Sequence, residues 1–403
     1  MHLERLELRD YRSYRAADVD LGGGVWVIVG DNAQGKTNLV EAVHYLAVGH
    51  SHRVAADAPL VRVGAEAAVV RAVARLAADG PGRRLTVELE IRPGGRNRCR
   101  LNGQPQNRTR EVIGRIRSVL FAPEDLQLVR GDPGERRRFL DDLLTQRRPA
   151  YAAARQDYER ILRQRNALLK SARAARSGAS RAPHPADTDA RAGGDALDTW
   201  TAALARAGAT LLAARIAAVH ALAGPTEQAY RDLVAASPAR EAAGRVVLRY
   251  ELSTGRPIPA DPAAGVPDPA SLDAELREGF AAVAAAERER GTTLAGPHRD
   301  ELFLGLNDLP AKGYASHGEH WSLALALRLA SREVLHEVGE EPIVLLDDVF
   351  AELDEQRRER LAARCAGFEQ VLVTAAVDGD VPLPGPRYRV RAGELTRDHP
   401  AGR

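Results

Sequence analysis

The stretch VWVIVGDNAQGKTNLVEAVHYL, residues 25–46, decides the fold. A run of apolar residues forms a strand, the segment GDNAQGKT (30–37) follows, and an amphipathic helix comes next. This is a P-loop in its strand, loop and helix context, so backbone N–H groups should surround the phosphates of a nucleotide. Lys36 adds a positive charge and the Thr37 hydroxyl binds Mg²⁺. The predicted nucleotide-binding residues are Gly30, Asp31, Asn32, Ala33, Gln34, Gly35, Lys36, Thr37 and Asn38.

A second motif, EEPIVLLDDVFAELD (340–354), predicts the partner of the P-loop. Four apolar residues form a buried strand that ends in two adjacent carboxylates, Asp347 and Asp348. A P-loop fold needs an Asp at the end of such a strand to complete the Mg²⁺ shell, and Asp347 fits that role. Asp348 then stands where a general base or a water-positioning carboxylate would face the γ-phosphate. Lys36 and Asp348 are therefore the predicted catalytic residues.

The loop SHGE (316–319) opens a helix whose leucines and alanines recur at helical spacing. One interpretation is a capping box, with Ser316 as the N-cap and Glu319 three residues later. The other is an anion site, because the first N–H groups of a helix have no partner inside it. The chain's own phosphates are already served by the P-loop helix, so such a site would serve a second subunit across a two-fold axis. The predicted signature residues acting on the partner's nucleotide are Ser316, Gly318 and Glu319.

Composition excludes several other classes of protein. No apolar run approaches a membrane span, and the charged start MHLERLELRD resembles neither a signal nor a transit peptide, which predicts a cytoplasmic protein. Two distant cysteines, Cys99 and Cys365, argue against a disulfide framework or a metal cluster. The net charge is only +2, but arginines concentrate within residues 130–176. That concentration fits either contact with nucleic acid or a solvated helix face.

The order of patterns along the chain predicts an α/β domain built from both ends of the chain, with a helical lobe inserted between them. Residues 1–132 are rich in strands and form the first half. Residues 133–290 are mainly helical, with a disordered loop near 177–198 that is rich in Pro and Gly. Residues 291–403 return to alternating strands and helices and complete the ATPase domain.

Six stretches carry a resemblance that spans nearly the whole chain. The stretches are LRDYRSY (8–14), GDNAQGKTNLVEAVHYLAVGHSHR (30–53), VLFAPEDLQLVRGDPGERRRFLDDLL (119–144), AGPHRDELFL (295–304), ASHGEHWSLALALRLA (315–330) and PIVLLDDVFAELD (342–354). Together they resemble the ATPase heads of the SMC/RecF-type ABC ATPase family.

The resemblance implies a weak, DNA-associated ATPase that binds ATP and Mg²⁺ and forms a homodimer on ATP. It also implies binding to single- and double-stranded DNA and to the junctions between them, in gap repair, replication restart and the SOS response. The implied partners are RecR and, indirectly, RecO and RecA, in a cytoplasmic, nucleoid-associated protein. Asp354 would belong to the D-loop. Arg12 is either a ligand of the nucleotide phosphates or an ordinary surface arginine.

At several positions this sequence differs from other ABC-type ATPases, and these differences bear on alternative functions. Asp348 replaces the Glu of fast ABC ATPases, which predicts slow hydrolysis, and Ala375 replaces the switch histidine of transporters. That replacement and the helical insertion argue against an ABC subunit that energises a transporter. A purely structural SMC-like protein would need a long coiled coil, but the insertion has no sustained heptads. His320 and Trp321 replace residues that are polar or basic in the family. No role follows for the segment GPHRD (296–300) beyond identifying the family, although His298 and Arg299 are candidate interface or nucleotide-sensing groups.

Overall fold

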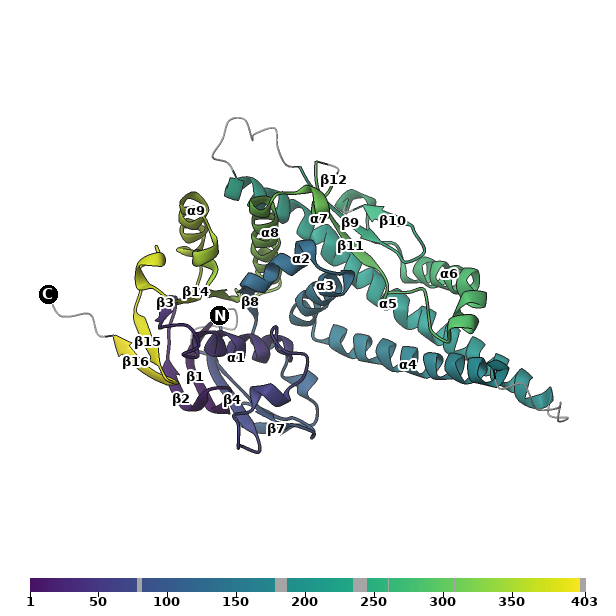
Figure 1. Ribbon diagram of the computed structural model, residues 1–403, viewed down its shortest axis with the longest axis horizontal. Helices are drawn as coiled ribbons and strands as arrows, with labels where there is room; N and C mark the ends of the chain where they lie inside the picture. The colour runs from purple at the N-terminus through teal and green to yellow at the C-terminus, as the bar shows by residue number, and fades with distance from the viewer. Residues whose placement is uncertain (78–81, 178–186, 235–244, 260, 308, 399–403) are drawn as a thin grey trace.

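The computed structural model describes residues 1–77, 82–177, 187–234, 245–259, 261–307 and 309–398 of the 403-residue chain. Figure 1 shows two lobes. The first contains the strands from the two ends of the chain, and the second consists mainly of long helices that extend away from it. This arrangement matches the predicted architecture, in which distant halves of the sequence build one α/β domain around an inserted lobe.

A six-stranded sheet at the centre of the first lobe joins the two halves of the sequence. Its strand order is β16-β15-β3-β14-β13-β8, and the pairs from β15 to β8 are parallel. Parallel order places the carboxyl ends of β3 and β13 at the same edge, which is where ligands bind in such sheets. The strands are β3 (Gly24–Val29), β8 (Ser118–Phe121), β13 (Ile343–Asp347), β14 (Gln370–Ala375), β15 (Arg387–Arg391) and β16 (Glu394–Asp398).

Both faces of this sheet are buried, because consecutive side chains of a strand point to opposite faces. One face packs in a core with α1 (Lys36–Val48), and the other packs in a core that includes α8 (His317–His336). The helix after the P-loop and the helix after the SHGE loop therefore lie on opposite sides of the sheet. The α1 side holds Ile28, Leu120, Leu345 and Leu372, and the α8 side holds Val27, Val119, Val344 and Val371.

An antiparallel sheet packs on the α1 side and completes the first lobe. Its strand order is β2-β1-β4-β5-β6-β7, and residues alternate between buried and more exposed along β4 and β5. That alternation is typical of a sheet with one face on a core and one toward solvent. The strands are β1 (His2–Tyr11), β2 (Tyr14–Asp20), β4 (Ala68–Arg75), β5 (Arg84–Ile91), β6 (Arg98–Leu101) and β7 (Gln104–Gln106).

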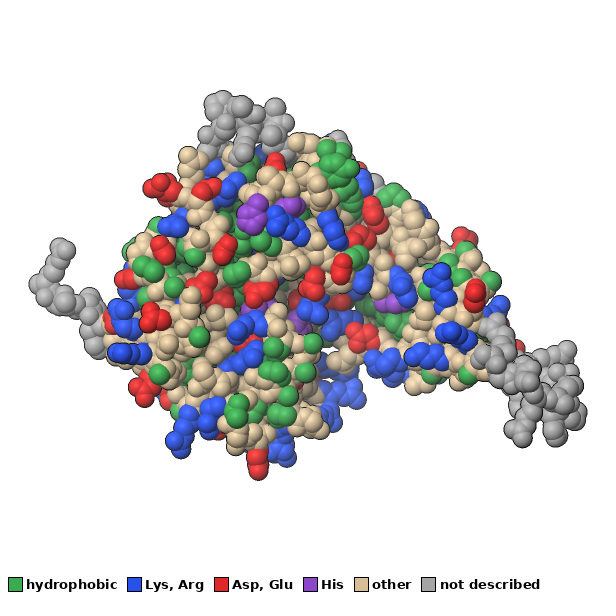
Figure 2. All heavy atoms as spheres, viewed as in Figure 1, with side chains coloured by type: hydrophobic (Ala, Val, Ile, Leu, Met, Phe, Trp, Pro, Cys, Tyr) green, Lys and Arg blue, Asp and Glu red, His purple; other side chains and the backbone are tan. Residues whose placement is uncertain are grey.

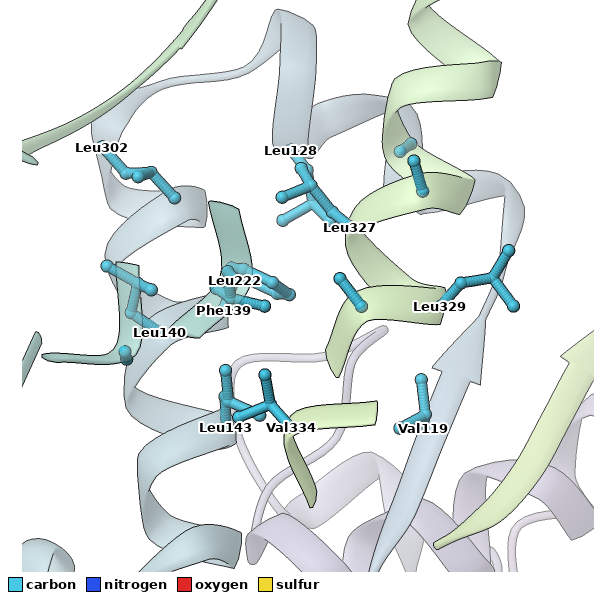
Figure 3. Packing of buried hydrophobic residues seen from close by; sticks show 14 of the residues in the cluster. Val119, Leu128, Phe139, Leu140, Leu143, Leu222, Leu302, Leu327, Leu329 and Val334 are labelled. Atoms are coloured by element: carbon cyan, nitrogen blue, oxygen red, sulfur yellow. The ribbon is translucent and has the colours of Figure 1, made fainter. Parts of the chain in front are cut away.

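The second lobe is a helical layer on a small sheet. Its helix α5 packs against α4, α6 and α8, and Figure 3 shows leucines of several elements meeting in this core, among them Leu128, Leu222 and Leu327. The helices are α2 (Leu126–Arg130), α3 (Pro133–Arg147), α4 (Ala150–Ser177), α5 (Asp187–Val234), α6 (Pro269–Arg290), α7 (Ala311–Tyr314) and, nearby, α9 (Glu355–Cys365). The sheet order is β10-β9-β11-β12, with β9 (Val246–Glu251), β10 (Pro257–Pro259), β11 (Glu301–Leu306) and β12 (Leu309–Pro310).

Two expectations about the inserted lobe need revision. The disordered loop predicted near 177–198 is helical from Asp187 onward, because α5 begins there. The last proline of that stretch is Pro185, and the alanines after it favour a helix; residues 178–186 lie outside the described residues. In addition, β11 pairs with β9, so the sheet of the inserted lobe extends past the boundary placed at 290.

Helix α5 contains a segment that the composition argument missed. Residues Asp195–Val234 are long and apolar enough, by length and composition alone, to cross a membrane. However, 56% of the most apolar window is buried inside the fold, against the neighbouring helices. Its alanine-rich sequence therefore reflects a helix that is packed on several sides, which is the usual origin of an all-round apolar helix in a folded domain.

Candidate nucleotide site

The P-loop wraps from β3 into α1 and depends on glycine. Gly35 has a φ of 116°, and a Cβ atom there would lie 2.8 Å from the Ser13 hydroxyl oxygen. A Cβ atom on Gly30 would lie 2.4 Å from the carbonyl oxygen of Val390 on β15. At Gly35 both the positive φ and the lack of space exclude a larger residue, and at Gly30 the lack of space alone does so. The spacing of the two glycines in the sequence thus has a direct steric cause.

Lys36 is the buried cation of this loop. Its side chain is almost fully covered, and Nζ donates to the carbonyl oxygens of Gly30 at 2.7 Å and Asp31 at 3.1 Å. Neither partner is a carboxylate, so the loop holds the ammonium group in place without neutralising its charge. A phosphate group would supply the missing negative charge. The loop tip is exposed at Asp31, Asn32 and Ala33, while the side chain of Gln34 accepts a hydrogen bond from the backbone N–H of Ala392.

Thr37 and Asp347 connect the two halves of the predicted site across 310 positions of sequence. The Thr37 hydroxyl donates to the Asp347 carboxylate at 3.0 Å, and Thr374 at the end of β14 donates to the same oxygen at 2.6 Å. Burial raises the pKa of Asp347 to about 6, and the nearby Asp348 carboxylate adds to that effect. The structure therefore brings together the two residues that the sequence predicted as Mg²⁺ ligands, and adds Thr374, which sequence reasoning missed.

The chemistry of this pair fits a divalent cation. A hydroxyl oxygen and a carboxylate are the hard oxygen ligands that Mg²⁺ prefers. Asp347 is buried with two hydroxyl groups as its hydrogen-bond partners, and neither of them offsets its negative charge. A bound Mg²⁺ would remove the cost of ionising this buried carboxylate and would shield the phosphate charge of a nucleotide.

Asp348 stands beside this pair with an unusual backbone. Its φ is 50° and its ψ is 20°, a left-handed conformation that non-glycine residues adopt rarely, and Asp is among those that tolerate it. Its backbone N–H donates to the Thr374 hydroxyl at 3.0 Å, which fixes the turn after β13. The side chain is partly exposed, unlike that of Asp347. The geometry thus separates a buried carboxylate from one that can reach solvent.

Arg12, the other predicted phosphate ligand, is engaged within the chain. It donates through Nε and Nη2 to the two carboxylate oxygens of Glu41, at 2.8 and 2.6 Å. Glu41 lies fully buried on α1, and burial alone would raise its pKa, but hydrogen bonds from Arg12 and Ser51 lower it overall. A contact between Arg12 and a nucleotide stays a prediction. In the sequence, Glu41 is visible only as one residue of the amphipathic helix pattern, and that pattern did not predict its ion pair with Arg12.

The SHGE loop forms a complete capping box. The Ser316 hydroxyl accepts from the backbone N–H of Glu319 at 3.4 Å, and the Glu319 carboxylate accepts from the backbone N–H of Ser316 at 2.7 Å. Ser316 and His317 are exposed at the start of α8. Figure 1 shows α7, just before the loop, among the elements of the second lobe and α1 on the other side of the central sheet.

Arg357 connects the helix that follows the SHGE loop with Asp354 of the predicted D-loop. Arg357 on α9 pairs with Asp354 at 2.5 Å and donates through Nε to the Ser322 hydroxyl on α8 at 3.1 Å. A Cβ atom on Gly318 would lie 2.8 Å from Nη2 of Arg357, so a larger residue there would shift this guanidinium group. The two motifs are thereby held as one surface. Sequence reasoning named Asp354 and Gly318 but missed Arg357.

The residues that depart from the family pattern face inward. His320 and Trp321 are only 4% and 2% exposed. Arg130 at the end of α2 donates through Nε to His320 Nδ1 at 2.9 Å, so the ring carries its proton on Nε2, which donates to the carbonyl oxygen of Ala311 at 3.0 Å. Burial and the neighbouring Arg130 lower the pKa of His320. These residues support the loop from beneath and leave its exposed face to Ser316 and His317.

Replacing Asp347 with Asn is expected to stabilise the nucleotide-free protein by about 1–2 kcal/mol at pH 8 and by about half as much at pH 5. A raised pKa means that the folded state keeps its proton to higher pH than the unfolded state. Stability is therefore lost as pH rises from about 4 to about 6, and Asn does not incur that loss. Urea denaturation at both pH values measures the effect. Equal stabilisation at pH 5 and pH 8 would contradict this account, and the exposed Asp195→Asn serves as control.

Comparison with known protein families places these motifs together. The family described as RecF/RecN/SMC N terminal domain matches residues 2–381. The chain belongs to the RecF/RecN/SMC family. This result confirms the predicted family and the predicted ABC-type P-loop ATPase fold.

Curated members of the RecF branch match along nearly their whole length. The chain is 52% identical over 402 residues to the DNA replication and repair protein RecF of Streptomyces avermitilis, covering 98% of this chain and 100% of that protein. It is also 52% identical over 403 residues to the protein of the same name from Frankia alni, with 98% and 100% coverage. The similarity includes the helical lobe as well as the ATPase motifs.

Solved RecF structures share the fold. The structure of the recombination mediator protein RecF with ATP, described as part of the RecFOR pathway, superposes with a TM-score of 0.84 at 25% identity and covers 99% of this chain and 98% of that chain. The Smc head domain of Pyrococcus furiosus bound to the C-terminal domain of ScpA has a TM-score of 0.50 at 16% identity, covering 98% and 96%. The second likeness concerns the fold alone.

Proposed function

We propose that this protein is an ATP-dependent DNA-binding protein of recombinational repair, which dimerises on ATP and hydrolyses it slowly. The observation that carries the proposal is the division of the site within one chain. Lys36, Thr37 and Asp347 are assembled at the edge of the central sheet where α1 begins and β13 ends, whereas the exposed loop at Ser316 begins α8, which packs on the face opposite α1. This division supports a site that is completed by a second copy of the chain, in which the loop serves the partner's nucleotide.

The residues of each copy would divide the work as follows. Backbone N–H groups of the P-loop and the Lys36 ammonium group bind the phosphates, and Thr37 with Asp347 holds Mg²⁺. Asp348 orients the attacking water, with a shorter reach than the Glu of fast ABC ATPases. The partner's Ser316, Gly318 and Glu319 present the N–H groups of the α8 terminus to the γ-phosphate. Arg357 and Asp354 stiffen that surface. ATP thus favours the dimer because it contacts both copies.

Its relatives, which include DNA replication and repair proteins and a recombination mediator of the RecFOR pathway, support a role on DNA. We propose that the ATP-bound dimer binds at junctions of single- and double-stranded DNA in gaps, during replication restart and the SOS response, with RecR as direct partner and RecO and RecA as indirect ones. Binding would rest mainly on phosphate contacts, so it would be salt-sensitive and weakly sequence-selective. The cell compartment would be the cytoplasm, at the nucleoid.

Fluorescence anisotropy of a labelled, gapped duplex tests this function. We expect binding with ATP and Mg²⁺ that weakens by at least tenfold with ADP or without nucleotide, and that falls steeply between 50 and 200 mM salt. A fully duplex and a single-stranded oligonucleotide of the same sequence serve as matched ligands. Equal DNA binding with ATP, with ADP and without nucleotide would contradict the proposed dependence of DNA binding on ATP. No binding to any of the DNA ligands would overturn the proposed function as a whole.

A further inference from the structure

A polar cavity of about 320 Å³ lies in the second lobe, where α3, α4 and α5 meet the segment GPHRD (296–300). None of its lining residues belongs to the P-loop, to the strand ending in Asp347 or to the SHGE loop. Figure 2 shows Lys and Arg side chains gathered along the face where α3 and α4 lie. The lining of the cavity includes Arg137, Arg138, Asp141, Arg155, Glu159 and Arg215.

The cavity has an excess of positive charge. Four arginines line it, against two acidic residues, Asp141 and Glu159. The Asp141 carboxylate is already held by two hydrogen bonds from buried Arg215, at 2.9 and 3.1 Å, and by a third from Tyr151. This carboxylate is therefore shared between Arg215 and Arg155 and does not offset the charge of the other two arginines. Arg155 lies 3.7 Å from Asp141 and 3.4 Å from Glu159, and its buried Nε makes no hydrogen bond within the described part of the chain.

Arg137 is the arginine whose charge is least compensated. It is half-buried on α3, and its Nη1 donates to the backbone carbonyl oxygen of Asp300 at 2.7 Å. The Asp300 carboxylate accepts from Tyr250 and Ser253 instead. Among the described residues, no carboxylate lies within ion-pair distance of Arg137, and burial and the charge of Arg215 lower its pKa. A partly desolvated cation without a counter-ion is costly unless an anion joins it.

His298 lines the cavity as a neutral group. Its Nδ1 lies 2.8 Å from the Tyr158 hydroxyl, and its Nε2 lies 3.4 Å from the carbonyl oxygen of Thr293. Burial lowers the pKa of His298 to about 4, so it stays uncharged near neutral pH. It can therefore orient Tyr158 without adding charge. The positive character of the cavity rests on the arginines alone.

We propose that this cavity binds the terminal phosphate group of a phosphorylated ligand. Guanidinium groups match phosphate oxygens through paired N–H donors, and Arg137, Arg138 and Arg155 converge from two helices. The volume lies at the lower end of ligand sites, which suits a phosphate with a small attached group such as a second phosphate or one nucleoside. The phosphate could come from a free nucleotide or from the end of a nucleic-acid strand, and both present the same dianionic group.

Titration calorimetry with inorganic pyrophosphate tests the site. The protein carries Lys36→Met, so that the P-loop cannot account for binding. We expect pyrophosphate and AMP to bind this variant. Adding Arg137→Gln should weaken the binding of pyrophosphate and of AMP by at least tenfold. Arg137→Lys keeps the positive charge but not the paired N–H donors of the guanidinium group, so it should weaken binding less. The control is Arg160→Gln on α4, which is 56% exposed outside the cavity and should change affinity by less than twofold.

The outcomes separate the alternatives. Competition of pyrophosphate by a 5′-phosphorylated oligonucleotide, but not by its unphosphorylated twin, would assign the phosphate to a strand end. No competition by either would assign it to a free small molecule. The proposal is overturned if Lys36→Met alone abolishes pyrophosphate binding, or if Arg137→Gln and Arg160→Gln behave alike in proteins whose melting temperatures match that of the parent.

Discussion

Replacing Lys36 with Met is expected to weaken ATP binding on the order of a thousandfold. The side chain is buried and its ammonium group is held by two backbone carbonyl oxygens, and no carboxylate of the described residues lies within ion-pair distance. Removing one partner of a buried, hydrogen-bonded charge pair costs about 2–5 kcal/mol, and each 1.4 kcal/mol is tenfold in affinity. Met has a similar length, so the loop should keep its fold. Equilibrium binding of a fluorescent ATP analogue measures the loss.

Lys170→Met is the matched control, because this exposed residue on α4 lies far from the motifs in the sequence. It should bind ATP as the parent does. DNA association of Lys36→Met should fall together with nucleotide binding, since the proposed dimer depends on ATP. If Lys36→Met bound ATP within a few-fold of the parent, the P-loop assignment would be wrong.

Replacing Asp348 with Asn is expected to lower the hydrolysis rate by about two to four orders of magnitude while leaving ATP binding intact. Asn keeps the size of the side chain and tolerates the left-handed backbone at this position, but it cannot accept a proton from the attacking water. ATP would then persist between the two copies and hold the dimer. Single-turnover hydrolysis and light scattering measure the two effects.

Asp195→Asn removes an exposed carboxylate on α5 and is the control for charge alone. It should hydrolyse ATP at the parent's rate. An Asp348→Asn protein that remained monomeric in ATP would refute the role given to this residue. One that hydrolysed ATP at the normal rate would move the water-positioning function to another side chain.

Motif spacing predicted the parts of the site that depend on the backbone. The glycines of the P-loop and the carboxylates after an apolar strand have local causes, namely steric exclusion at Gly30 and Gly35 and the parallel order of β3 and β13. These causes act within a few residues or through the sheet, so they leave a pattern in the sequence. The contact between Thr37 and Asp347 followed directly from that pattern.

Contacts between side chains from distant elements left no such pattern. Arg12 pairs with Glu41, Arg357 bridges Asp354 and Ser322, and Thr374 binds Asp347. In the sequence, an arginine on the surface looks the same as one in a buried ion pair. Its partner is set by how whole helices and strands pack, which the local sequence does not show. The helix at 187–198 was missed for a related reason, because its small residues looked like a loop until α5 extended through them.

The measurement that tests the central claim most directly is the solution mass of the protein without nucleotide, with ADP and with ATP and Mg²⁺, repeated for Ser316→Arg. Ser316 is exposed at the start of α8, and an arginine there would block a partner's phosphates sterically without entering the core. His336→Arg, exposed at the far end of the same helix, is the control. The account predicts that the protein is a dimer only with ATP and Mg²⁺. This dimer should be lost in Ser316→Arg and kept in His336→Arg. A monomer in every condition, or an unaffected Ser316→Arg dimer, would contradict it and leave the SHGE loop as a helix cap.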